Sequence, residues 1–195
     1  MRRLMKTTTA VLLLAAVALG GCRSTQEALE IGAASESNPG PCPRAFALYD
    51  AARIVEFRDG AERFANVGFT GEIGKIRSLC RYYSARPIIG DIEIVFDLGR
   101  GPAAETQDTA TYEYFVAVTR KNIGVINKQV FPLQVKFPAG KDRVRVVERV
   151  EEYVIPRAGE GTSGENFEII VGFVVTEAQR QFNSEGKRFR VSAGK

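Results

Sequence analysis

The stretch PIIGDIEIVFDLG, residues 87–99, decides the fold class because apolar and acidic side chains alternate along it with a period of two. Successive side chains of a β-strand point to opposite faces, so this alternation predicts a strand with one face buried and the other in water. The predicted buried set is Ile88, Ile92, Ile94, Phe96 and Leu98, and the predicted exposed set is Asp91, Glu93 and Asp97.

The same period recurs in VFPLQVKF (130–137), RVRVVERVEEYV (143–154) and FEIIVGFVV (167–175). Shorter strands are predicted at 52–57 and 114–118. The expected buried residues of the three longer segments are Phe131, Leu133, Val135 and Phe137; Val144, Val146, Val150 and Val154; and Phe167, Ile169, Val171, Phe173 and Val175.

Breaks in the period mark bends and turns. Apolar residues between Val67 and Tyr83 change parity near a cluster of glycines, which indicates a β-bulge or a bend that switches sheets. PAGKD, 138–142, is expected to turn a hairpin between two predicted strands. TEAQRQFN, 176–183, predicts the one helix, with Thr176 as N-cap, and the final GKRFRVSAGK is expected to be a frayed basic tail.

About seven short strands separated by turns predict an all-β domain, either a sandwich or a small barrel. The run of strands resembles an immunoglobulin-like β-sandwich in architecture. The sequence contains no tryptophan, and Cys42 and Cys80 are too close in sequence for the inter-sheet bridge of antibody domains. The likeness therefore implies the arrangement of sheets and nothing about activity.

The N-terminus is typical of an export signal. Three basic residues stand within the first six positions, and the apolar run Ala10–Leu19 is about half the roughly 20 residues needed to cross a bilayer. The tetrad Leu19-Gly20-Gly21-Cys22 that follows resembles the lipobox of bacterial lipoproteins. That resemblance implies a diacylglyceryl group on the Cys22 thiol and cleavage just before it, whereas a plain secretory signal with an incidental cysteine is the alternative.

The lipobox resemblance implies a membrane partner and a location. Several acyl chains on one residue make a lasting anchor, and Arg23 is not the aspartate that typically retains such proteins at the inner membrane. We therefore expect residence at the outer membrane, facing the periplasm. Residues 1–21 are then the signal peptide, the polar segment 22–41 a lipidated flexible tether, and 42–195 the β-sandwich domain.

Charge argues against nucleic acid as a partner. The chain has 27 basic and 23 acidic residues, but the three basic residues of the signal leave with it. The remaining 24 basic residues against 23 acidic ones give a net charge of +1, which is too small for an electrostatic footprint on a polyanion.

Once the signal peptide and Cys22 are excluded, two cysteines are left, Cys42 and Cys80. In an oxidising compartment an even pair most simply predicts one disulfide, and a metal site is the rival interpretation. The sequence has no histidine, and only these two thiols remain, so neither a four-ligand zinc site nor a Cys-x-x-Cys redox motif can be built from the usual residues. We expect no metal and no cofactor.

Candidate catalytic motifs are weak. GEGTSG, 159–164, has the spacing of a dinucleotide-binding loop but stands before a predicted strand where that motif needs a helix, so we interpret it as a flexible hairpin loop. Carboxylates gather on two strands, at Asp91, Glu93 and Asp97 and at Glu148, Glu151 and Glu152, where a pair could act as acid and base. The wet side of a sheet explains them as well. We therefore expect no enzyme.

Two functions fit these observations. The first is a non-catalytic binding or envelope-assembly module that engages an envelope protein through a sheet edge or the long loops 99–111 and 156–166. The aromatic residues of TYEYFVAV and CRYYS are core residues or a recognition patch. The alternative function is a carrier whose strands curl round an apolar cavity for a lipid or other small ligand. An interior filled by the side chains of both sheets would favour the binding module, whereas a sizeable apolar cavity would favour the carrier.

Overall fold

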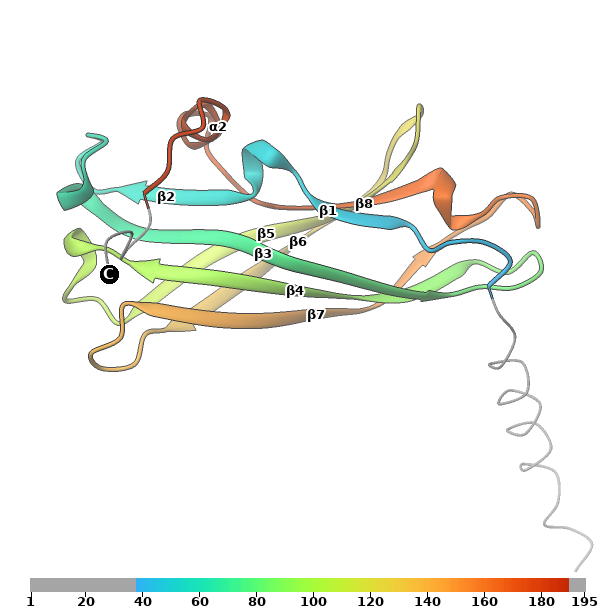
Figure 1. Cartoon of the computed structure of the whole chain (residues 1–195), viewed down its shortest axis with the longest axis horizontal. Coiled ribbons are helices and arrows are strands. Elements are labelled where there is room, and N and C mark those ends of the chain that lie inside the picture. Colours follow the sequence, from blue (N-terminus) through green and yellow to red (C-terminus); the bar gives the residue numbers. More distant parts are fainter. Residues whose placement is uncertain (1–37, 190–195) are drawn as a thin grey trace, which may run out of the picture. The chain divides into compact units, whose positions relative to one another are not determined.

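Residues 38–189 form two four-stranded β-sheets in the computed structural model, which describes this part of the chain (Figure 1). Sheet A has the strand order β1-β8-β5-β6, and sheet B has the order β2-β3-β4-β7. The strands are β1 (Arg44–Ala47), β2 (Arg53–Phe57), β3 (Val67–Arg81), β4 (Ile88–Arg100), β5 (Thr109–Arg120), β6 (Gly124–Lys136), β7 (Arg143–Ile155) and β8 (Phe167–Phe173). The helical segments are η1 (Tyr49–Ala51), η2 (Phe64–Asn66), η3 (Pro102–Ala104), η4 (Gly164–Asn166) and α2 (Glu177–Ser184).

The expected all-β sandwich is confirmed, with eight described strands instead of about seven. The additional strand is β1, which pairs in parallel with β8, whereas the other neighbouring strands are antiparallel. After β1 the chain passes through η1 and enters the other sheet as β2. The first two described strands thus join sheet A to sheet B.

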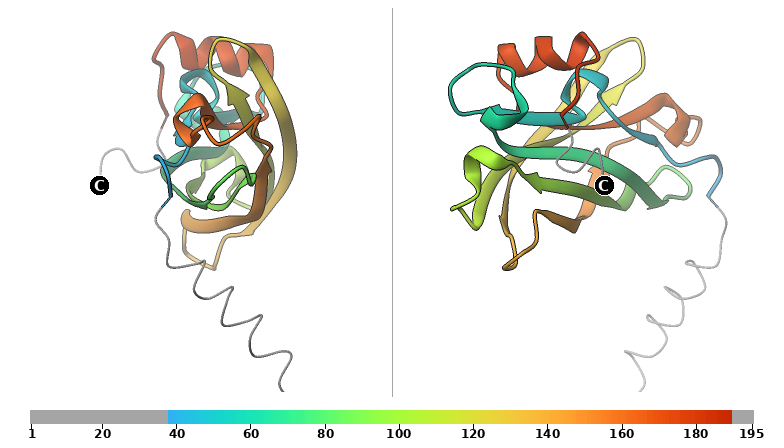
Figure 2. Two further views of the ribbon diagram at one scale, coloured as in Figure 1. Left: turned by 90° about the vertical axis from the view of Figure 1, so that its right-hand side faces the viewer. Right: turned by 60° about the vertical axis from the view of Figure 1, so that its left-hand side comes forward.

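The core lies between the sheets and is built from the alternating faces that the sequence predicts. Ile88, Ile92, Ile94 and Phe96 are fully buried and Leu98 nearly so. β4 runs through the middle of sheet B, between β3 and β7, so its apolar face meets the opposite sheet along its length (Figure 2). The opposed face comes mainly from β5, β6 and β8, whose buried residues include Tyr112, Tyr114, Leu133, Val135, Phe167, Ile169, Val171 and Phe173.

The parity change in β3 is a β-bulge within one continuous strand. Its pairing with β4 shifts register between Ile73 and Ile76. Ile73 is buried before the bulge, and Ile76 packs against the same core after it. The extra residue keeps the apolar set on one face, so β3 stays in sheet B and does not switch sheets.

A second bulge overturns the prediction for Val154. That residue was expected to face the core, but it is 55% exposed, and Tyr153 and Ile155 are buried instead. The β4–β7 register shifts between Gly90 and Ile92, and Glu152 in the facing strand has φ 57°. One extra residue at this point turns every later side chain to the other face.

The turn at residues 138–142 forms, but it is not a hairpin. The Lys141 N–H donates to the Pro138 carbonyl at 3.0 Å, and Gly140 has φ 70°, which suits glycine. However, β6 belongs to sheet A and β7 to sheet B, so the connection crosses from one sheet to the other. The local sequence predicts that the chain turns here, but it does not predict with which strand β7 pairs.

Helix α2 begins as predicted. The Thr176 hydroxyl accepts a hydrogen bond from the Gln179 N–H, and the Gln179 side chain accepts one from the Thr176 N–H, which together form a capping box. The start of the expected frayed tail is packed: the Phe189 ring lies 5.6 Å from Phe57 and 5.9 Å from Phe182. Residues 190–195 lie outside the described residues.

The export signal, Cys22 and most of the expected tether also lie outside the described residues. The described chain starts at Asn38, whose side chain already contacts the sandwich at Cys80. Of the helices between residues 38 and 189, none has the length and apolar character to span a bilayer.

Candidate functional site

The disulfide Cys42–Cys80 is confirmed and joins the segment before β1 to the end of β3, with 5.7 Å between the two Cα atoms. Asn38 reinforces this junction: its amide donates to the Cys80 carbonyl, and its side-chain oxygen accepts from the Tyr82 N–H, both at 3.0 Å. The buried Tyr82 hydroxyl donates to the Pro41 carbonyl at 2.9 Å. The disulfide and these bonds fix the incoming chain to sheet B.

The loop 156–166 packs against the same end. The Tyr82 hydroxyl also accepts from the Gly164 N–H at 3.1 Å, and the Arg157 guanidinium lies over the Tyr82 ring at 4.7 Å. Arg157 donates to the main-chain carbonyls of Ser84, Arg86, Glu160 and Thr162. The Gly-x-Gly-x-x-Gly stretch leads into the three-residue 3-10 helix η4 and then β8, and not into the α-helix whose N-terminus would receive a pyrophosphate.

The loop 99–111 lies at the other end of the sandwich (Figure 1). Its free part is shorter than expected because β4 continues to Arg100 and β5 begins at Thr109. Arg100 anchors it by donating to the Gln107 carbonyl at 3.1 Å and to the Asp142 carboxylate at 2.9 Å. The two loops proposed as binding elements therefore do not form one site.

The carboxylates of β4 lie on the outer face of sheet B and take part in ion pairs and hydrogen bonds with the neighbouring strands. Glu93 lies between Arg77, at 3.1 Å, and Arg149, at 3.3 Å, and Asp97 accepts from Arg145 at 2.7 Å. The hydrogen bond to Asp97 raises the pKa of Arg145. The Asp91 carboxylate accepts from the Glu152 N–H at 3.1 Å. These contacts are those of an outer sheet surface with cross-strand ion pairs.

The carboxylates of β7 do not converge either. Glu151 and Glu152 are exposed, whereas Glu148 is half-buried on the inward side of the strand. Burial, and to a lesser extent the charge of Glu148, raises the pKa of Tyr114 to about 12. A tyrosine held neutral in this way is a core residue.

The aromatic residues are mostly core. Tyr82, Tyr112 and Tyr114 are 1 to 2% exposed, and burial raises the pKa of Tyr112. Phe115 is buried on the other face of β5 with Ala51 and Ala117, and the Lys128 ammonium lies 4.3 Å from its ring centre. Tyr83 is half-buried beneath Arg86. The interpretation as core residues holds for Tyr82, Tyr112, Tyr114 and Phe115 but not for Tyr83.

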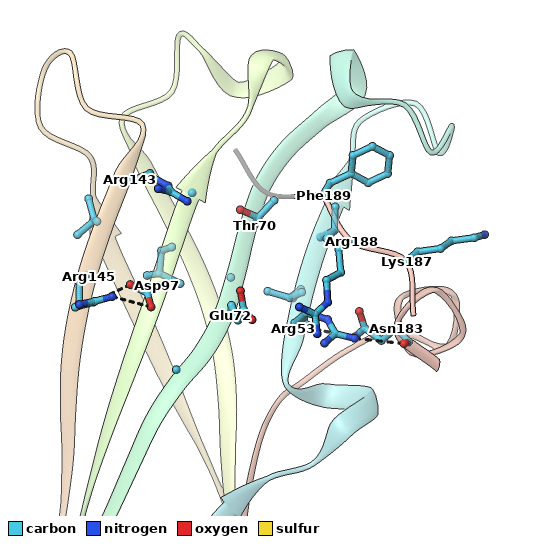
Figure 3. Close-up of a pocket in the computed structure, with 17 residues that line it drawn as sticks. Arg53, Thr70, Glu72, Asp97, Arg143, Arg145, Asn183, Lys187, Arg188 and Phe189 are labelled. Carbon is cyan, nitrogen blue, oxygen red and sulfur yellow. Dashed lines mark hydrogen bonds and ion pairs between the residues drawn. The ribbon is translucent and has the colours of Figure 1, made fainter. Parts of the chain in front are cut away.

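A groove of about 550 Å³ crosses the outer face of sheet B (Figure 3). Its floor is formed by parts of all four strands, and the segment Lys187–Phe189 after α2 forms one wall. Gly74 leaves this part of the groove floor free of side-chain atoms, and a Cβ there would come within 3.2 Å of the Asp97 carboxylate. The groove was not predicted because its residues are far apart in sequence.

The groove is rich in cations. Its charged lining residues are Arg53, Glu72, Asp97, Arg143, Arg145, Lys187 and Arg188. Arg145 pairs with Asp97, and Lys187 lies 2.8 Å from Glu62 and 2.7 Å from Glu185, which raise its pKa chiefly through hydrogen bonds. Within residues 38–189 no carboxylate lies within ion-pair distance of Arg53, Arg143 or Arg188.

A second unusual surface is the free edge of β6. Within the described residues this strand pairs only with β5, and Gly124–Val130 is exposed throughout. Ile123, Val125, Ile126 and Val130 expose 45 to 71% of their surface. Apolar side chains grouped along an open strand edge are typical of an interaction site.

Within the described part of the chain, no group of three or more metal-ligating side chains comes together. Comparisons of the sequence with family models and curated proteins, and of the structure with solved structures, found no match.

Proposed function

We propose that this protein is a non-catalytic binding or envelope-assembly module, anchored in the outer membrane by acyl chains on Cys22 and facing the periplasm. Its partner is an envelope protein that adds an extended strand to the free edge of β6. The observation that carries the proposal is that β6 is the one described sheet edge left long, open and apolar. Main-chain hydrogen bonds supply much of the affinity in strand addition, so no catalytic group is needed.

Two of the other edges are short, and one of them is covered. β1 has four residues. β2 has five, and α2 caps its main chain: the Gln179 amide donates to the Val55 carbonyl at 3.0 Å, and the Asn183 amide donates to the Arg53 carbonyl at 2.8 Å. Short and covered edges prevent unwanted pairing.

The β7 edge is long but protected in another way. It carries charged residues along its length, and the bulge at Glu152 bends it away from regular pairing. β6 has Pro132 near its middle, which cannot donate a main-chain hydrogen bond. We therefore place the partner strand against the half of β6 from Gly124 to Phe131.

The core packing supports a module over a carrier. The Phe96 ring lies 5.0 Å from Tyr114 and 5.5 Å from Phe173, and Tyr114 lies 5.3 Å from Phe131. Aromatic rings at these separations fill the space between the two sheets. The described groove lies on the outside of sheet B and is lined by many charged side chains, unlike the apolar interior that a lipid carrier needs.

Photo-crosslinking in cells tests the partner. A photoreactive amino acid at Asn127 on β6 should give one reproducible adduct with an envelope protein, and the same amino acid at Glu151 on β7 should not. Val130→Lys should abolish the adduct, whereas Val147→Lys, at a β7 residue of similar exposure, should leave it unchanged. Equal adducts from both positions, or an adduct that survives Val130→Lys, would refute the β6 edge as the interface.

The anchor is tested separately. Cys22→Ser should leave an uncut precursor or release a soluble protein, and detergent phase partitioning distinguishes these from the acylated form. Density-gradient separation of the two membranes should place the wild-type protein in the outer-membrane fraction. A mature N-terminal residue other than an acylated cysteine would remove the anchor from the proposal.

A further inference from the structure

The groove on sheet B contains a buried guanidinium, that of Arg53, with no carboxylate within ion-pair distance among residues 38–189. Arg53 is only 8% exposed, and its Nε has no hydrogen-bond partner in the described part of the chain. The hydrogen bond of its NH2 group to the Asn183 carbonyl is long, at 3.4 Å, and the guanidinium otherwise lies 5.2 Å from the Tyr49 ring centre. A buried charge normally has an ion pair or several hydrogen bonds, so this arrangement is incomplete.

A second arginine shares this end of the groove. Arg188 lines it as well, and Figure 3 shows its side chain running from the chain after α2 toward Arg53. Neither arginine has a carboxylate partner within residues 38–189. Two guanidinium groups directed into the same space repel each other unless an anion lies between them.

From this geometry we infer that the groove binds a phosphate-bearing ligand, with one phosphate between Arg53 and Arg188. A phosphate monoester carries a charge of about −1.5 to −2 at neutral pH, which matches two guanidinium groups better than a single carboxylate does. The planar fork of arginine also binds phosphate oxygens in pairs. The site is independent of the β6 edge and of the anchor.

The length of the groove indicates more than one anionic group. Arg53 stands on β2 and Arg143 on β7, three strand spacings apart, which is about 14 Å. Arg143 points toward the groove from the far side in Figure 3. A ligand that extends from the first phosphate across β3 and β4 therefore brings a second anionic group to Arg143.

One acid of the groove is already neutralised, because Asp97 pairs with Arg145 at 2.7 Å. It therefore does not oppose an anion in the groove.

Calorimetric titration of the full chain with inorganic pyrophosphate tests the inference. We expect saturable 1:1 binding that weakens with added salt, and weaker binding of succinate, a dicarboxylate. Arg188→Gln should lower the affinity for pyrophosphate by at least about tenfold, the effect of losing charge-assisted hydrogen bonds. Arg143→Gln should lower it less.

Arg149→Gln is the matched control, since Arg149 is an exposed arginine on the same face of sheet B outside the groove. It should leave the affinity unchanged. Arg53→Lys keeps the positive charge and removes the planar guanidinium, so it should weaken binding without unfolding the chain. Circular dichroism checks that the variant is folded. Titrating the Cys22→Ser chain with phosphatidylglycerol vesicles, with and without pyrophosphate, shows whether a lipid headgroup supplies the phosphate.

Displacement of the chain from the vesicles by pyrophosphate would assign a lipid source, and binding of pyrophosphate without vesicle binding would assign a soluble one. Absence of saturable binding would overturn the inference, as would equal effects of Arg188→Gln and Arg149→Gln. Binding that appears only after removal of residues 190–195 would also overturn it, because the intact chain would then occupy its own groove.

Discussion

Tyr82→Phe should destabilise the domain by about 2–3 kcal/mol, because one hydroxyl joins three segments at the disulfide end. It donates to the Pro41 carbonyl at 2.9 Å and accepts from the Gly164 N–H at 3.1 Å. A buried group left without its partner costs about 1–3 kcal/mol. Gly164 is buried and bears this cost in full, whereas Pro41 is exposed and regains part of its loss from water.

The substitution isolates the hydroxyl. Phenylalanine fills the same space in the core and keeps the ring beneath Arg157, so neither a cavity nor a lost cation–π contact contributes. Urea denaturation followed by far-ultraviolet circular dichroism measures the change, since the chain has no tryptophan for fluorescence. The expected loss corresponds to a fall in melting temperature of about 4–12 °C.

Tyr83→Phe is the control, because the adjacent ring is half-buried under Arg86 and its hydroxyl makes no hydrogen bond within the described residues. It should change the free energy of unfolding by less than about 0.5 kcal/mol. If Tyr82→Phe also fell within that range, the hydroxyl would not be the joint between the N-terminal segment and the loop 156–166.

Three further predictions concern stability. Replacing Cys42 and Cys80 together by serine should cost about 4 kcal/mol, the chain-entropy value for a loop closed over a sequence separation of 38, and reductant should move the wild-type urea midpoint toward that of the variant. Thr176→Ala removes the helix cap and should cost about 1 kcal/mol in the same assay. Partial desolvation raises the pKa of the exposed Glu56 against the opposing charge of Arg58, so the stability tied to its neutral form is present at low pH and is lost as pH rises through the raised pKa. Glu56→Gln should therefore be more stable than the wild type at pH 7 and equal to it below about pH 4, as measured by urea midpoints across that range.

Local patterns in the sequence predicted most of the sandwich. The alternation through Ile92 and Phe96 predicted β4 and its buried face, because a half-buried strand can place its side chains in only one way. The glycines near Ile73 marked a bulge, and Thr176 marked the start of α2. These features depend on neighbours in sequence.

Features that depend on distant neighbours were not predicted. β1 has four residues and pairs in parallel with β8, more than 120 positions later, so no local signal marks it. Val154 is exposed because one extra residue at Glu152 shifts the strand by one position. Nothing in the local sequence marks the positive φ of Glu152. The connection at 138–142 has ordinary turn residues and leads into another sheet, which only the packing of the two sheets decides.

The groove shows the same limit. Arg53, Arg143 and Arg188 come from the two ends of the described chain and from β7, and each alone has the sequence context of a solvated surface cation. What distinguishes Arg53 is burial beneath α2 and the segment after it, which a strand pattern does not contain. A cation on the outer face of a strand next to a later amphipathic helix is the nearest signal the sequence offers.

The position of the disulfide also decides how the domain bears mechanical load. Cys42 precedes β1, so tension applied at the N-terminal end of the described chain reaches the covalent bridge first and passes through Cys80 into β3. β3 is held on both sides, by β2 and β4, and resists shear along its length. The pairing of β1 with β8 is the shortest in sheet A, with four residues, and the bridge keeps this tension off it. Reduction of the Cys42–Cys80 disulfide would transfer the tension to the β1–β8 hydrogen bonds.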